Sequence, residues 1–154
     1  MAIDYASATP KDLQQMVDLL GMLFEQEAEF RPDAEKQKQA IEAILANPVI
    51  GRLYVAREAR RVLAMASLLY TVSTAEGGKA AWFEDLVVHP DERNRGIGEA
   101  LLKHVVAQAR ADGVRRITLL TDMQNERAQA MYRRVGFVGS PMRPMRLKLT
   151  KGSK

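Results

Sequence analysis

The feature that most constrains the fold is a change of hydrophobic period in the second half of the chain. Residues 81–88 form an apolar run that ends at His89-Pro90, and residues 97–111 carry apolar side chains at helical spacing. Residues 117–121 return to a short buried strand pattern. Since the intervening helix carries the chain back across the sheet, the two strands are expected to pair in parallel. This unit predicts an α/β fold.

The first part of the chain adds helices and an antiparallel hairpin. Residues 3–6 alternate like a strand, and a helix follows the N-cap sequence Thr9-Pro10. A charged turn joins two strand patterns at residues 53–57 and 62–70. The other predicted elements are helices near 34–46 and 125–134 and strands at 137–138 and 145–149. We therefore expect one domain over residues 1–154, with a mixed, mostly antiparallel central sheet flanked by helices.

Composition excludes several kinds of chemistry. The 154-residue chain is long enough to bury a core, and it contains no cysteine, which excludes disulfides and thiolate catalysis. With His89 and His104 as the two histidines, the sequence predicts no metal site. The N-terminal residues show no basic segment followed by an apolar one, and no apolar run approaches membrane-spanning length. A cytoplasmic location without membrane contact is expected.

Charge is distributed unevenly along the chain. Residues 1–90 hold 9 basic and 13 acidic side chains, a net charge of −4, whereas residues 91–154 hold 14 and 6, a net charge of +8. The second half is therefore suited to attract a phosphorylated ligand, although an unevenly charged solvated surface gives the same composition. Nucleic acid is not the expected partner, because the basic residues are scattered and lack interleaved aromatic side chains.

The stretch RNRGIG at residues 93–98 lies between the strand and the helix. The start of a helix leaves backbone N–H groups unpaired and carries a positive dipole end, so it can bind an anion. Gly96 and Gly98 would let the backbone approach phosphate oxygens, and Arg93 and Arg95 would add donors. The third glycine of a dinucleotide motif and the Gly-Lys-Ser/Thr of a Walker loop are both absent. Alone, the stretch fits either a phosphate-binding loop or a glycine-containing helix start.

The stretch RNRGIG resembles the Gln/Arg-x-x-Gly-x-Gly/Ala motif of the GNAT superfamily of N-acetyltransferases. Three other segments agree with the family in order: EDLVVHP with its preceding strand, ITLLT with its next strand, and NERAQAMYRRVGF with its closing Asn-x-x-Ala-x-x-x-Tyr-x-x-x-Gly-Phe segment. The strong resemblance covers about residues 82–138. It implies a GNAT-like fold and acetyl-CoA as cosubstrate.

The resemblance also implies where acetyl-CoA would bind. Its pyrophosphate would lie on the backbone N–H groups of residues 95–100, and its pantetheine arm along the strand that ends in EDLVV. Asn125 would bond the pantetheine arm, although an N-cap role explains it equally well. Arg133 or Arg134 would meet the 3′-phosphate, unless they only form an exposed helix face. The implied binding residues are Leu86, Val87, Val88, Arg93, Arg95, Gly96, Ile97, Gly98, Glu99, Ala100, Asn125 and Arg133.

By the same resemblance, Tyr132 would protonate the leaving sulfur. Direct attack on a thioester requires a neutral amine, and an amine with a pKa near ~10 is almost wholly protonated at neutral pH, so a base is needed. Glu84 is the predicted base because the Glu-Asp-Leu grouping is similar to that of diamine acetyltransferases. Strand alternation would point Asp85 to the opposite face. A packed aromatic at 132 and a capping or paired carboxylate at 84 are the structural alternatives.

The expected acceptor is a cationic primary amine: a polyamine, an aminocyclitol or a lysine-like peptide amine. Acidic side chains gather around the early helices, although a solvated helix face gives the same pattern. The predicted acceptor residues are Glu25, Glu29, Ser73, Thr74 and Glu84. A non-catalytic acyl-CoA sensor is the alternative function. A homodimer is possible, but no segment by itself specifies its interface.

Overall fold

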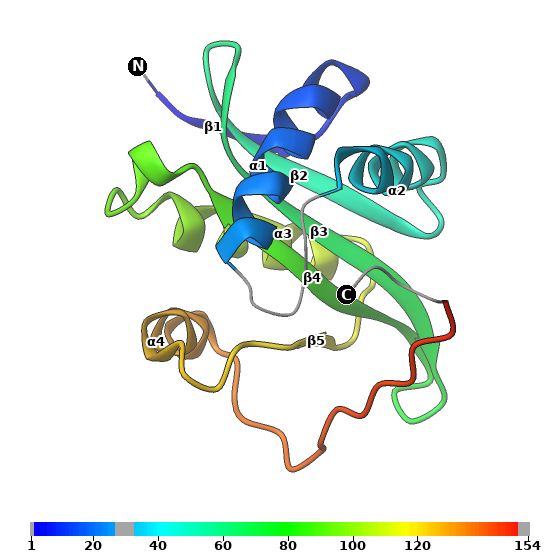
Figure 1. The fold of residues 1–154 in the computed structure, drawn as a ribbon. Coiled ribbons are helices and arrows are strands. Elements are labelled where there is room, and N and C mark those ends of the chain that lie inside the picture. Colours follow the sequence, from blue (N-terminus) through cyan, green and yellow to red (C-terminus); the bar gives the residue numbers. More distant parts are fainter. Residues whose placement is uncertain (1, 27–32, 151–154) are drawn as a thin grey trace.

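The computed structural model describes residues 2–26 and 33–150, which form a five-stranded sheet with helices on both faces (Figure 1). The strands are β1 (Asp4–Ser7), β2 (Gly51–Glu58), β3 (Arg61–Ser73), β4 (Gly78–Val88) and β5 (Ile117–Leu119). They lie in the order β1-β2-β3-β4-β5. The first four pair antiparallel and β5 pairs parallel to β4, which confirms the mixed, mostly antiparallel sheet.

The helices are divided between the two faces of the sheet. They are α1 (Leu13–Gln26), α2 (Ala34–Ala46), α3 (Ile97–Ala111) and α4 (Glu126–Val135). α1 and α2 share a core with Met65 and Val87, whereas α3 shares a core with Leu68 and Phe83, because side chains alternate along each strand. α4 lies against α3. Within the described ranges, none of these helices combines the length and hydrophobicity needed to span a membrane.

An ion pair fixes the start of α1 on the sheet. Asp12 accepts hydrogen bonds from the backbone N–H of Thr9 (2.8 Å) and from the Arg57 guanidinium of β2 (2.8 and 3.0 Å). Burial alone would raise the pKa of Asp12, but the hydrogen bonds from Arg57 and Thr9 outweigh burial and hold that pKa below its ordinary value. The chain therefore enters α1 with a defined direction across the face of the sheet.

The strands expected at residues 137–138 and 145–149 are not formed, so these two predictions were wrong. Neither segment pairs with a described strand. Val138, Leu147 and Leu149 are 87%, 82% and 89% exposed. Alternating apolar residues favour a strand, but a strand also needs a neighbouring edge to pair with, and among residues 2–26 and 33–150 neither segment is paired with one.

Candidate functional site

The sheet opens between β4 and β5. β5 pairs with β4 only from Ala81 to Phe83, whereas β4 remains paired with β3 as far as Val88. His89 donates its backbone N–H to the Leu63 carbonyl at 2.8 Å. Because antiparallel neighbours alternate between bonded and non-bonded pairs, the backbone N–H and C=O groups of Leu86 and Val88 point away from β3. A free backbone edge at residues 86–88 therefore lies beyond the end of β5.

A β-bulge lies at Glu84. Ser67 pairs with Asp85 and Leu68 with Phe83, so Glu84 is the extra residue, and its side chain is exposed. Its carboxylate makes no hydrogen bond or ion pair within the described residues. Strict alternation does not hold across a bulge, so the argument that placed Glu84 and Asp85 on opposite faces fails.

Asp85 lies on the face covered by α1 and α2. The Asp85 carboxylate accepts a hydrogen bond from the Ser67 hydroxyl at 2.9 Å, and the backbone N–H of Asp85 donates to the oxygen of that hydroxyl at 3.1 Å. Ser67 is two residues from Met65, which belongs to the α1 and α2 core, and strand residues at this spacing share a face. This buried serine and its partner carboxylate were not among the site residues predicted from the sequence.

The loop before α3 has the conformation expected of a helix start that leaves N–H groups free. Gly96 has φ 74° and Asn94 has φ 67°, both in the left-handed region that favours glycine. A Cβ at Gly98 would lie 3.2 Å from Val88 Cγ2, so Gly98 allows the helix to pack closely on β4. Ala100 donates its N–H to the Gly96 carbonyl at 3.1 Å. The free N–H groups therefore end at Glu99, one residue short of the predicted set.

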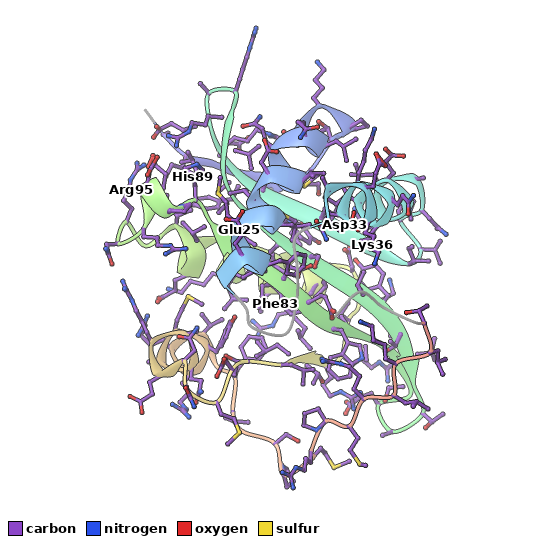
Figure 2. The ribbon with its side chains drawn as sticks, viewed as in Figure 1. Glu25, Asp33, Lys36, Phe83, His89 and Arg95 are labelled. Carbon is purple, nitrogen blue, oxygen red and sulfur yellow. The ribbon has the colours of Figure 1, made fainter. Side chains whose placement is uncertain are left out.

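Two arginines bond to side chains of this loop. Arg95 bonds Glu92 (3.1 Å) and Glu58 of β2 (3.3 Å), so its guanidinium orders the loop. Figure 2 shows Arg95 and His89 together on this side of the sheet. Arg127 of α4 donates to the Asn94 side chain. Arg127 occupies a variable position of the closing motif, so the sequence carried no signal for this contact.

Two basic side chains form ion pairs with Glu99 in the first turn of α3. Arg134 pairs with Glu99 at 2.7 Å, and Lys103 pairs with the same carboxylate at 3.3 Å. The hydrogen bond from Arg134 and then that from Lys103 hold the pKa of Glu99 below its ordinary value. Arg134 is therefore engaged in the first turn of α3. Arg93 and Arg133 have exposed side chains.

Tyr132 lies on α4 and packs against the core that contains α3. Its ring packs against that of Phe137, with centroids 5.9 Å apart, and burial raises the pKa of its hydroxyl. A Cβ added at Gly98 would lie 3.9 Å from Met131 Sδ as well as 3.2 Å from Val88 Cγ2, so Met131 and Val88 meet on either side of Gly98. Met131 of α4 is thus next to both the start of α3 and Val88 of β4, and Tyr132 follows it in the sequence. The hydroxyl of Tyr132 has no hydrogen-bond partner in the described part of the chain.

Asn125 is the N-cap of α4. Its side chain accepts a hydrogen bond from the backbone N–H of Ala128 at 3.1 Å. This confirms the capping role that the sequence had left as one of two explanations. The side-chain amide nitrogen is not used in this cap, because a cap employs only the oxygen.

The predicted acceptor residues are only partly brought together. Glu25 lies exposed at the end of α1, on the face where α1 contacts β4 (Figure 2). Ser73 and Thr74 lie at the tip of the β3–β4 hairpin, five residues or about 17 Å along β3 from Leu68 and the bulge. There, Ser73 Oγ accepts from the Glu76 N–H at 3.1 Å and closes the turn. Glu29 lies outside the described residues.

An α/β sheet that opens beside the start of a helix, with free backbone groups on both sides, defines a binding fold for an extended anionic ligand. Residues 13–137 match the model of the acetyltransferase (GNAT) family, and the chain belongs to this family. The mixed sheet and flanking helices are thus those of a GNAT fold, as the resemblance implied.

Individual proteins extend this comparison. The chain is 27% identical over 143 residues to a glucosamine 6-phosphate N-acetyltransferase of Trypanosoma brucei brucei, with 90% of each chain covered. It is 35% identical over 66 residues to an uncharacterized N-acetyltransferase of Methanocaldococcus jannaschii, covering 43% of this chain and 29% of that one. A predicted acetyltransferase of Clostridium acetobutylicum, solved with acetyl-CoA, superposes with a TM-score of 0.78 at 19% identity, covering 96% and 97% of the two chains.

The match to several curated relatives is confined to part of their length. The aligned region covers 29%, 9% and 36% of three of these proteins. Those relatives therefore contain further sequence with no counterpart in the aligned region.

Proposed function

We propose that the protein, as one domain over residues 1–154, transfers the acetyl group of acetyl-CoA to a primary amine. The observation that carries this proposal is the free backbone edge of β4 at residues 86–88, next to the unpaired N–H groups at the start of α3. Such an arrangement suits a ligand with an extended, amide-containing arm and a pyrophosphate at one end. The crystal structure of the Clostridium relative contains this ligand.

The residues present fit acetyl-CoA. The N–H groups of residues 95–99 would hold the pyrophosphate, and the Glu99 carboxylate would not repel it strongly, because Arg134 and Lys103 neutralise it. Leu86 and Val88 would bond the pantetheine arm through their backbone, and the amide nitrogen of Asn125 could donate to it. Arg133, exposed at the end of α4, would meet the 3′-phosphate. The bound cosubstrate supplies an activated thioester.

Two side chains would then move protons. Glu84 accepts a proton from the acceptor ammonium, which frees the nitrogen lone pair. As that nitrogen forms the new C–N bond, the C–S bond breaks and Tyr132 donates its hydroxyl proton to the departing sulfur. The nitrogen loses its second proton to become the amide, and this proton balances the one that Tyr132 gave up, so the hydroxyl is restored. Because burial raises the pKa of Tyr132, this hydroxyl is protonated at neutral pH and able to act as the acid.

We propose a cationic small-molecule or peptide amine as the acceptor. Glu25, exposed at the end of α1, and Glu84, exposed at the bulge of β4, supply negative charge. These carboxylates would attract a polyamine or an aminocyclitol. They would repel a phosphorylated amino sugar, the acceptor named for the Trypanosoma relative.

Thermal unfolding with acetyl-CoA tests the cosubstrate first. At about 100 times its dissociation constant, a ligand of the native state adds ~2.7 kcal/mol, which raises the midpoint of a domain of this size by roughly 5–10 °C. S-acetylpantetheine lacks the pyrophosphate and should give a much smaller rise at equal concentration. No rise with acetyl-CoA would refute the proposal.

Thiol release with a panel of amines then tests the transfer. Polyamines, aminocyclitols, lysine peptides and glucosamine 6-phosphate should be compared at saturating acetyl-CoA. Release with the first three groups above that with the amino sugar phosphate supports the proposed acceptor. Binding of acetyl-CoA without release by any amine would indicate the acyl-CoA sensor instead.

A further inference from the structure

Four charged side chains link the loop before α3 to the turn between β2 and β3. Glu92 accepts a hydrogen bond from Arg61 at 3.0 Å and another from Arg95 at 3.1 Å. Arg95 also pairs with Glu58 at 3.3 Å. The charges alternate along the series Arg61, Glu92, Arg95 and Glu58, and we call these four residues the charge clamp. The clamp joins segments that are 31 and 37 residues apart in the sequence.

The turn between β2 and β3 gives the clamp a fixed base. Glu58 and Arg61 are the last residue pair of the two strands, so their opposite charges leave the hairpin side by side. Gln15 of α1 bonds the backbone on both sides of Arg61. Its side chain donates to the Arg60 carbonyl at 3.0 Å and accepts from the Val62 N–H at 2.8 Å. The turn is therefore held to α1 as well as to the sheet.

The loop at the other end of the clamp has a backbone that needs support. Asn94 and Gly96, on either side of Arg95, have φ of 67° and 74°. Residues in the left-handed region are uncommon apart from glycine, and they persist where the surrounding structure holds them. The clamp holds the loop from the β2–β3 side, and Arg127 holds it from α4 through the Asn94 side chain. The directions of the free N–H groups at the start of α3 follow from this backbone conformation.

Glu92 is the central member of the clamp. Its side chain is only 12% exposed, and its two oxygens are divided between two arginines, with Oε1 toward Arg61 and Oε2 toward Arg95. Because this carboxylate is shielded from water, salt screens its ion pairs less than it screens those at the surface. A glutamine at this position has one side-chain oxygen and cannot accept from both arginines in the same way. Replacing Glu92 therefore opens the clamp in the middle.

We propose that Glu92 is a positioning residue for the pyrophosphate of acetyl-CoA, acting through Arg95 and the rest of the clamp rather than by contact with the ligand. This inference rests on the proposed function. Two acidic and two basic members give the clamp no net charge, so its effect is to hold the N–H groups of the loop in place. Charge alone predicts the opposite result, because removal of a carboxylate near an anion favours binding of that anion. The sign of the change in affinity thus distinguishes the two effects.

Isothermal titration calorimetry with acetyl-CoA tests the proposal. Glu92→Gln should raise the dissociation constant of acetyl-CoA about 10-fold, because the binding groups are no longer preorganised. The dissociation constant of S-acetylpantetheine, which lacks the pyrophosphate, should stay within about 2-fold of the wild-type value, and so should kcat at saturating acetyl-CoA. Glu42→Gln is the matched control, because it removes the same charge from the exposed pair with Lys38 on α2. This control should bind acetyl-CoA as the wild type does.

A second variant keeps the test decisive if Glu92→Gln does not fold, as judged by circular dichroism. Glu58→Gln removes only the outer pair with Arg95 and should weaken acetyl-CoA binding by about 3-fold. A folded clamp variant that binds acetyl-CoA as tightly as the wild type, or more tightly, would refute the positioning role alone. An equal loss of affinity for both ligands would also refute it, since the effect would not depend on the pyrophosphate. A wild type with no affinity for acetyl-CoA would refute the proposed function and this role with it.

Discussion

Replacing Tyr132 by phenylalanine should separate catalysis from folding. The ring packs against Phe137 with centroids 5.9 Å apart, and phenylalanine keeps this contact. The hydroxyl has no hydrogen-bond partner in the described residues, so its removal leaves no protein group unsatisfied. We therefore expect the free energy of unfolding to change by less than about 0.5 kcal/mol, and the midpoint by less than about 2 °C.

Turnover should respond very differently. A general acid contributes about 10²–10⁴ to the rate, so kcat for Tyr132→Phe at saturating acetyl-CoA should fall at least about 100-fold. KM for acetyl-CoA should change little, because the proposed binding contacts are backbone groups of β4 and α3. Since burial raises the pKa of Tyr132, its acid form is complete at neutral pH and is lost only as the pH rises above the ordinary tyrosine value near ~10.

The assay is release of the CoA thiol, with thermal unfolding run on the same samples. Tyr70→Phe is the matched control, because Tyr70 is also a half-buried tyrosine of the α3 core but lies near Asp112 at the far end of that helix. Its turnover should stay at the wild-type level. The assignment fails if Tyr132→Phe keeps wild-type turnover, or if its turnover falls only together with its unfolding midpoint.

Two further changes test the base and the ion pair under α1. Glu84→Gln should lower turnover most at low pH and shift the pH–rate profile to higher pH, because the variant can use only acceptor amine that is already neutral in solution. A profile at the same pH as that of the wild type would mean that another group is the base. Asp12→Ala leaves Arg57 without its buried partner and should cost about 3 kcal/mol at pH 7, whereas the exposed Asp18→Ala should cost little. Because the pKa of Asp12 is lowered in the folded state, its contribution to the free energy of unfolding is present above the ordinary pKa near ~4 and is lost as the pH falls through the folded pKa. The difference in unfolding midpoint between the wild type and Asp12→Ala should therefore be smaller at pH 3 than at pH 7. An equal gap at both pH values would contradict this account.

The sequence predicted the elements that local patterns specify. Residues 34–46 and 97–111 were predicted as helices, and the structure has the same bounds, because amphipathic spacing, caps and a terminal Gly or Asn-Pro act within a few residues. The family motif likewise placed the loop before α3. It overestimated the free N–H groups by one, because the first helical bond, from Ala100 to Gly96, is set by where the helix begins.

Other parts of the site depend on residues far apart in the sequence. The bulge at Glu84 arises from the pairing of β4 with β3, so alternation within β4 alone does not fix how Glu84 and Asp85 are oriented relative to one another. The contact of Ser67 with Asp85 spans 18 residues, and that of Arg95 with Glu58 spans 37. No local pattern contains such partners.

The sequence alone therefore determined the α/β class, the glycine-containing helix start and the family, because each is written in neighbouring residues. The tertiary structure decided which groups are free to act. It engaged Arg95 and Arg134 with carboxylates, left the backbone groups of Leu86 and Val88 that point away from β3 without a strand partner, and left the apolar segment at 145–149 without a described partner strand. These outcomes depend on which strand edges and charges meet in space, and pairing between distant segments is fixed only when the whole chain has packed.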